Sequence, residues 1–256
     1  MAMAGPSATT TGTIPRASRP MHMTTIQPRG TAIRTGTAIP TTISTTTPEA
    51  ARLLLAQILS PAFPVGGFAW SQGLEWAMDQ GAVTRATLSQ WLADWMDHGA
   101  GWTDAVLAAL SLRATDHASL DDLARAACLT AQRLAETAEQ GTAFAANITA
   151  LTGQPQPPAA LPVAFGRACA AMPLPHPEII AAFLQAQAAA LISAAVRFMP
   201  LGPVEGQRML TALQPAILAT AGRAAQATED DLASTAWGAD IAAMRHETMP
   251  VRIFRS

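Results

Sequence analysis

The segment Pro61–Glu75 reads PAFPVGGFAWSQGLE and interrupts a chain whose pattern is otherwise apolar and helical. Pro64 fixes its own φ and moves the residue before it out of the α region. Gly66 and Gly67 permit positive φ or a close approach of the backbone. Ser71 is then placed to cap a new helix. The segment therefore predicts a shaped aromatic loop that leads into a helix.

Helical periodicity continues on both sides of this loop. In residues 84–98, for example, apolar side chains recur at three- and four-residue steps. We find no run that alternates with a period of two, and the intervening loops are short. The sequence therefore predicts an all-α protein, a single compact bundle of about nine to ten helices. The expected helices lie at about 48–59, 71–80, 84–98, 103–114, 119–140, 143–151, 161–171, 177–198, 204–226 and 230–247.

Particular residues set the boundaries of these helices. Ser119, followed by two aspartates, is expected to be an N-cap. Gly141 is expected to divide the helical stretch that follows. Pro215 predicts a kink or a division in the segment 204–226. Asp230 or Asp231 is expected to begin the last helix.

Residues 1–48 differ in composition from the rest of the chain, because they are rich in Thr, Pro, Gly and Ala and contain no acidic residue before Glu49. Such a segment buries too little apolar surface to offset the entropy lost on ordering. We predict a disordered Thr/Pro/Arg-rich extension over 1–48 and an all-α domain over 49–256. The same composition also fits a transit peptide, or a start codon that lies later, at Met21 or Met23.

Overall composition excludes several classes of function. The net charge of −2 gives no electrostatic case for binding nucleic acid or an anionic membrane. The chain has no lysine, so it lacks the P-loop lysine of an NTPase. Cys128 and Cys169 form no CxxC motif, and we expect them to be buried free thiols in a reducing cytosol, with a disulfide between them as the alternative. The apolar run Ile179–Met199 contains polar residues such as Gln185, which favours a buried helix of a soluble protein over a membrane span.

Three ordered motifs resemble the urease accessory protein F family (UreF). The first is the pattern Pro-x-Gly-(Gly/Ala)-Phe-x-aromatic-Ser-x-Gly-Leu-Glu within the loop segment. The second is RFMPLG at Arg197–Gly202, and the third is MRHETMPVRIFRS at Met244–Ser256. VAFG at Val163–Gly166 adds weaker support. Together the matches cover about residues 51–256, roughly four fifths of the chain.

This resemblance implies a non-enzymatic chaperone or scaffold in urease maturation. Proteins of the UreF family form a complex with the accessory protein UreD (also called UreH) and the GTPase UreG. The complex acts on apo-urease, where nickel and a carbamylated lysine are installed. The resemblance therefore implies a cytoplasmic homodimer with no intrinsic cofactor, because nickel is handled by the complex.

Candidate partner-binding residues lie in the loop and at the C-terminus. Trp70 is either a core residue or an exposed hot spot, and we favour the exposed position. Arg252, Phe254 and Arg255 follow the last helix and are expected to be partly free of the core, where arginine forks and an aromatic ring are typical docking anchors. The candidate residues are Gly66, Gly67, Trp70, Gln72, Glu75, Arg245, His246, Glu247, Arg252, Phe254 and Arg255.

We predict no catalytic group and no metal ligands. A nucleophile elbow needs Gly-x-Ser-x-Gly on a strand-to-helix turn, but Ala69 replaces the first glycine before Ser71. His246 and Glu247 are adjacent, so on a helix they point about 100° apart and converge poorly on a metal. Two alternatives stay open from the residues alone: a small helical hydrolase or transferase that uses Ser71, and a generic helical adaptor unrelated to urease.

Overall fold

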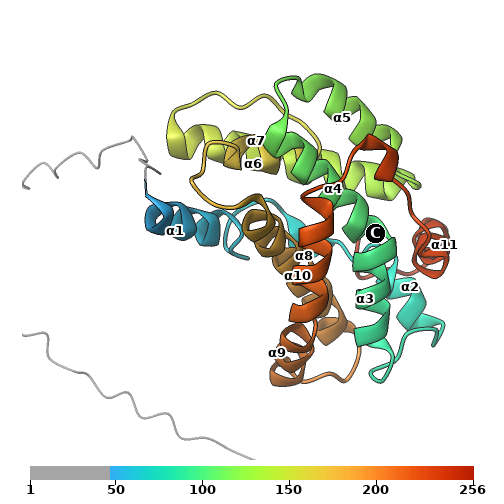
Figure 1. Ribbon diagram of the computed structural model, residues 1–256. Coiled ribbons are helices and arrows are strands. Elements are labelled where there is room, and N and C mark those ends of the chain that lie inside the picture. The colour runs from blue at the N-terminus through green and yellow to red at the C-terminus, as the bar shows by residue number, and fades with distance from the viewer. Residues whose placement is uncertain (1–46) are drawn as a thin grey trace, which may run out of the picture. The chain divides into compact units, whose positions relative to one another are not determined.

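The computed structural model describes residues 47–256, which contain eleven α-helices, two short 3-10 helices and no strand (Figure 1). The prediction of an all-α fold is confirmed for this part of the chain. The expected disorder of residues 1–48 lies, up to residue 46, outside the described residues. The helices are α1 (Pro48–Ile58), η1 (Gly67–Ala69), α2 (Leu74–Asp79), α3 (Leu88–His98), α4 (Ala100–Arg113), α5 (His117–Ala126), α6 (Ala131–Thr152), α7 (Leu161–Cys169), α8 (His176–Phe198), α9 (Pro203–Ala212), α10 (Gln214–Ala224), η2 (Glu229–Asp231) and α11 (Trp237–His246).

The helix that follows the aromatic loop begins later than predicted. α2 starts at Leu74 rather than Ser71, because Gln72 and Gly73 have left-handed φ values of 54° and 80°. Ser71 still satisfies the first turn, since its Oγ accepts a hydrogen bond from Glu75 N at 3.3 Å. Ser71 therefore caps the helix as predicted, but two residues of irregular backbone, Gln72 and Gly73, separate the serine from the helix.

The helical stretch after residue 115 divides at a different place from the one predicted. Asp116, not Ser119, caps α5 by accepting from the backbone N–H of Ala118 and Ser119. The break falls between α5 and α6, where the Thr130 side chain caps α6. Gly141 lies inside α6 because a Cβ there would come 2.0 Å from the carbonyl oxygen of Ala159. That glycine serves close packing rather than a break.

Two predictions near the C-terminus have different outcomes. Pro215 does accompany a division: α9 ends at Ala212, and α10 begins at Gln214 with the proline in its first turn. The last helix does not begin at Asp230 or Asp231, since these residues lie in η2 and α11 begins at Trp237.

The core is formed where α4, α6, α7 and α8 pack together. A row of phenylalanine rings crosses it from the aromatic loop to α8. Phe63, Phe144, Phe165 and Phe183 have successive ring centroids 5.7, 6.1 and 4.7 Å apart. Aromatic pairs at such distances add about 0.5–1.5 kcal/mol each beyond their area burial. The loop is therefore fixed to the core at Phe63.

Within the described residues, α8 alone is long and apolar enough to meet the length and composition criteria for crossing a membrane. It packs against α4, α9 and α10. Its buried residues include Ile179, Phe183 and Leu184, which belong to the common core. These contacts agree with the prediction of a buried core helix.

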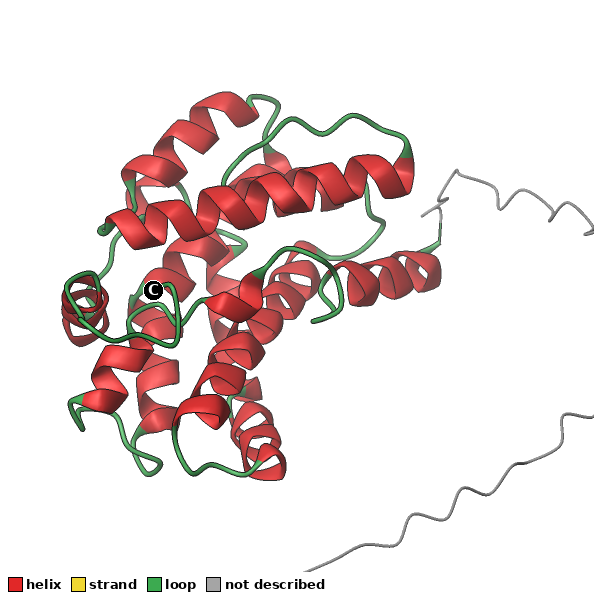
Figure 2. Ribbon diagram, turned by 180° about the vertical axis from the view of Figure 1, so that it is seen from behind, coloured by secondary structure: helices red, strands yellow, loops and turns green. Residues whose placement is uncertain are grey.

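α1 and α11 lie on opposite sides of the helical body in both ribbon views (Figures 1 and 2). α11 packs directly on α2. Gly73 makes this close approach possible, because a Cβ at that position would come 2.4 Å from Ala243 N. The last helix is thereby held beside the aromatic loop, and the C-terminal segment continues from it.

Candidate partner-docking site

The C-terminal segment Thr248–Ser256, called the tail below, folds back onto the aromatic loop. Arg255 N donates to Ala69 O at 2.8 Å, and Ser71 N donates to Ser256 O at 2.8 Å. The Ser71 hydroxyl also donates to Ser256 O, and Gln72 N donates to Ser256 Oγ at 3.2 Å. Two segments more than 180 residues apart in sequence are thus joined through their backbones.

The prediction that the tail is partly free of the core is correct for some of its residues and wrong for others. Arg252 and Arg255 are exposed. Phe254 and Ser256 are buried. The tail is irregular, as expected, but its last four residues, 253–256, are anchored by hydrogen bonds to the loop and α2.

Glu75 is the central anchor of the tail. Its carboxylate is 1% exposed and accepts hydrogen bonds from Ile253 N at 2.6 Å and Phe254 N at 2.9 Å. His246 Nε2 of α11 lies 2.9 Å from the same carboxylate. The other ring nitrogen, Nδ1, lies 2.9 Å from Gln132 Oε1 on α6. One buried carboxylate therefore links α2, α11 and the tail.

Arg197 brings the second motif to the same place. Its guanidinium lies 3.5 Å from the ring centroid of Phe68 in the loop and 4.5 Å from that of Phe254 in the tail. A guanidinium over an aromatic face is attracted by the ring quadrupole. The three motifs that are separate in the sequence thus meet around one arginine side chain.

Trp70 and Arg255 form a second contact between loop and tail. The Arg255 guanidinium lies 4.3 Å from the Trp70 ring centroid and is paired with Glu139 of α6 at 2.6 and 2.8 Å. This pairing lowers the pKa of the Glu139 carboxyl. Trp70 is only 4% exposed, so the expected exposed position is wrong; the exposed aromatic of the loop is Phe68, at 70%.

The other candidate residues lie outside the contacts between loop and tail side chains described above. Gly66 has φ of 77° and is open to solvent, while Gly67 begins η1. Gln72 is turned inward, where its side chain bonds to Glu136 and Trp95. On α11 and just beyond it, Arg245 is exposed and Glu247 accepts from Gln132 N at 3.1 Å.

A groove of about 770 Å³ runs between α2, α11 and the tail. It is next to a concentration of exposed apolar side chains that the sequence analysis did not select. Of the eleven large hydrophobic residues that are exposed in the described chain, five lie after residue 236. They are Trp237, Ile241, Met244, Val251 and Ile253. The first three follow the i, i+4, i+7 spacing of one helix face, a signal that was present in the sequence.

Two arginines border this groove without a side-chain partner among residues 47–256. Within residues 47–256, the arginine side chains that make neither a hydrogen bond nor an ion pair are those of Arg208, Arg245 and Arg252. Arg245 lines the groove, and Arg252 lies in the tail between Val251 and Ile253. The surface therefore combines exposed apolar groups with unpaired positive charge.

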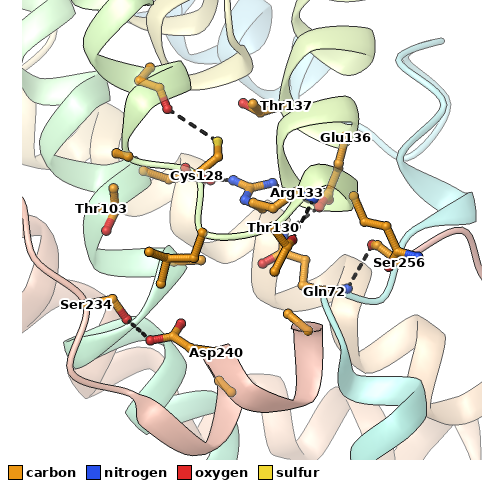
Figure 3. A pocket seen from close by; sticks show the side chains of 18 of the residues that line it. Gln72, Thr103, Cys128, Thr130, Arg133, Glu136, Thr137, Ser234, Asp240 and Ser256 are labelled. Atoms are coloured by element: carbon orange, nitrogen blue, oxygen red, sulfur yellow. Dashed lines mark hydrogen bonds and ion pairs between the residues drawn. The ribbon is translucent and has the colours of Figure 1, made fainter. Parts of the chain in front are cut away.

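A smaller cavity of about 60 Å³ lies beneath the loop and the end of the tail (Figure 3). Arg133 forms ion pairs there with Asp104 and, at 3.0 Å, with Glu136. Burial raises the pKa of both carboxyls, and the arginine opposes that rise. Gln72 connects this cluster to the tail, because its side chain donates to Glu136 and its backbone donates to Ser256.

The described residues provide no basis for catalysis at Ser71 or for a metal centre. Ser71 is fully buried, and its hydroxyl is engaged with Ser256 and Glu75. No group of three or more His, Cys, Asp or Glu in residues 47–256 is arranged to hold a metal ion. Both cysteines are free thiols; Cys169 is buried and Cys128 is partly exposed.

Comparison with known proteins gives a consistent assignment. A family model described as UreF matches residues 82–214. "Urease accessory protein UreF" of Paracoccus denitrificans is 75% identical over 215 residues, which cover 84% of this chain and all of the relative. The proteins of the same description from Cereibacter sphaeroides and Roseobacter denitrificans are 54% and 43% identical, over 81% and 80% of this chain and 100% and 93% of their own lengths. The chain therefore belongs to the UreF family of urease accessory proteins.

Proposed function

We propose that this chain is a non-enzymatic scaffold in urease maturation and that its tail and aromatic loop form the docking face for other accessory proteins. The convergence of three sequence motifs on one face is the observation that carries the proposal. Family membership supplies the urease context, and the burial of Ser71 removes the basis for the hydrolase or transferase alternative.

The proposed partners are the accessory protein UreD (also called UreH), the GTPase UreG and apo-urease. In this complex the chain couples the nucleotide state of the GTPase to nickel delivery. Because the chain has no lysine, the P-loop chemistry belongs to the partner. Nickel is the cargo of the complex, and no intrinsic cofactor is proposed for this chain.

The chemistry of the docking face indicates what a partner segment must present. Large apolar side chains such as Ile241, Val251 and Ile253 favour burial against apolar groups. Arg245 and Arg252 favour carboxylates, which arginine binds through paired hydrogen bonds. The best-fitting partner segment therefore carries acidic residues next to large apolar ones.

We also propose that the chain forms a homodimer, through a second surface. An open groove of about 550 Å³ lies between α1, α8 and α10 and is lined on α8 by the small side chains Ala181, Ala182 and Ala189. Leu218 of α10, which is exposed, also lines it. A self-complementary apolar face of this kind suits a symmetric pair of identical helices.

Free cysteine thiols support the proposed cytoplasmic location, where disulfides are rare. Burial raises the pKa of both the Cys128 and the Cys169 thiols, which keeps them protonated and poorly reactive.

Deletion of Val251–Ser256 tests the docking proposal. The truncated chain is expected to lose recovery of UreD and UreG in a pull-down, because the deletion removes Arg252, Arg255 and the Phe254 anchor. Circular dichroism provides the folding control, and helix content should be unchanged since the tail contributes none. Undiminished recovery of both partners by a folded, truncated chain would remove the tail from the interface.

A further inference from the structure

Glu75 and His246 were selected from the sequence as residues that contact a partner, but their surroundings favour a different role. Both side chains are almost completely buried, at 1% and 0% exposure. Glu75 already accepts three hydrogen bonds, from His246 and from the backbone N–H groups of Ile253 and Phe254. Neither side chain presents a free surface to another protein.

The imidazole of His246 is bound on both sides. Nε2 lies 2.9 Å from Glu75 Oε2, and Nδ1 lies 2.9 Å from Gln132 Oε1. Each ring nitrogen of His246 thus faces an oxygen atom of another helix, Glu75 on α2 or Gln132 on α6. The arrangement is a buried pair of His246 and Glu75 fixed to α6 through Gln132.

The side chains beside these anchors point the other way. Val251, Arg252 and Ile253 are exposed, although Ile253 N is bound to Glu75. In this short segment, a backbone N–H group is therefore bound to a buried carboxylate while the side chains are exposed to solvent. Gln72 also fixes the end of the tail, because its backbone N–H donates to Ser256 Oγ.

We propose that Glu75 and His246 are positioning residues that lock the tail in its docked conformation, while a partner contacts only the exposed side chains of the tail. The inference rests on the proposed function, since it explains how the tail is kept in the conformation that binds the partner. Apparent affinity is reduced by the fraction of molecules that are in the competent conformation. A tail that is docked in about one molecule in ten binds its partner about tenfold more weakly.

The test uses the full chain with Glu75→Gln, which keeps the size of the side chain but removes its charge and one acceptor oxygen. Asp79→Asn is the matched control, because Asp79 lies one turn further along α2, is exposed and lines the same groove. Hydrogen exchange of residues 248–256 reports the tail directly. The ¹⁵N chemical shifts of the His246 imidazole report its contact with Glu75 directly, a signature that general destabilisation of the fold does not produce.

We expect tail exchange at least about tenfold faster in Glu75→Gln, unchanged exchange in α7 and α8, and changed ¹⁵N shifts of the His246 imidazole. Unchanged tail exchange would overturn the inference. Tail exchange fast enough to show that most molecules are undocked, together with undiminished binding of UreD, would support the lock and contradict the proposed docking role of the tail, so the two failures are distinguishable.

His246→Asn is a second variant, which tests the lock alone if Glu75→Gln does not fold and completes a double-mutant cycle if it does. Residues that act through one contact show non-additive effects in a double-mutant cycle. We therefore expect tail exchange in the double variant to be close to that of either single variant. Additive effects on exchange would mean that the two side chains act independently and would contradict a single lock.

Discussion

The guanidinium of Arg197 lies 3.5 Å from the ring centroid of Phe68, although 128 residues separate them in sequence. The same guanidinium lies 4.5 Å from the ring of Phe254. One side chain from the end of α8 thus holds the aromatic loop and the tail together. The docking face depends on this contact as well as on Glu75.

Replacing Arg197 by methionine is expected to loosen the loop and the tail while keeping most of the apolar packing. Cation–π contacts at exposed sites contribute about 0.5–1 kcal/mol each, so loss of two contacts costs about 1–2 kcal/mol. Urea unfolding measures the change. Arg208→Met on α9 is the control, since that arginine is exposed and has no partner within residues 47–256, and an equal loss of stability there would contradict the account.

Gly73→Ala is expected to destabilise the chain strongly because two effects act together. The residue has φ of 80°, which costs a non-glycine residue about 1–2 kcal/mol, and its Cβ would come 2.4 Å from Ala243 N. Overpacking adds about 1–3 kcal/mol. Gly81→Ala separates the effects, since Gly81 has φ of 70° but open space around its Cβ. Thermal unfolding should show a clearly larger loss for Gly73→Ala; equal losses would mean that α11 does not pack there.

Glu136→Gln tests the buried cluster through its pH dependence. Burial raises the pKa of Glu136 in the folded chain, so folding takes up a proton at this group. Its contribution to stability is therefore fully present below the unfolded pKa and is lost as pH rises through the folded pKa. The stability difference between wild type and Glu136→Gln should shift in favour of wild type as pH falls from 7 towards 4. Chemical denaturation at several pH values measures it, and a constant difference would contradict the assignment.

Ala182→Arg tests the proposed dimer surface by placing a charge on the α8 face of the groove. The expected result is a monomer by light scattering with unchanged helix content. Gln207→Arg on α9, where the side chain is exposed, is the control and should leave the oligomeric state unaltered. A dimer that persists in Ala182→Arg would place the two-fold contact elsewhere.

Local sequence signals predicted the helices and the motifs, whereas the contacts between distant segments were not predictable. Apolar periodicity located α3 and α8, and Pro215 marked the division before α10. Gly141 was misread as a helix break, because its packing against Ala159 depends on where the linker after α6 runs. Such contacts depend on the tertiary arrangement and have no local signature.

In the candidate site, too, the contacts between distant segments could not be predicted from the sequence. The sequence selected the loop and the tail, yet it could not show that Trp70 and Phe254 are buried against arginines of other segments. Exposed residues of α11 such as Trp237 were not selected, although their spacing along one helix face was visible.

The most direct test of the account is the affinity of the chain for UreD after reversal of the two unpaired arginines at the groove. The variant Arg245→Glu with Arg252→Glu alters only exposed side chains, so it leaves the buried anchors of the tail intact. Loss of one interface anchor typically costs about 2 kcal/mol or more, which is roughly a thirtyfold loss of affinity. We predict at least that loss by calorimetry, with Arg208→Glu binding like wild type. Wild-type affinity in the doubly reversed chain would contradict the claim that this face docks the accessory partner.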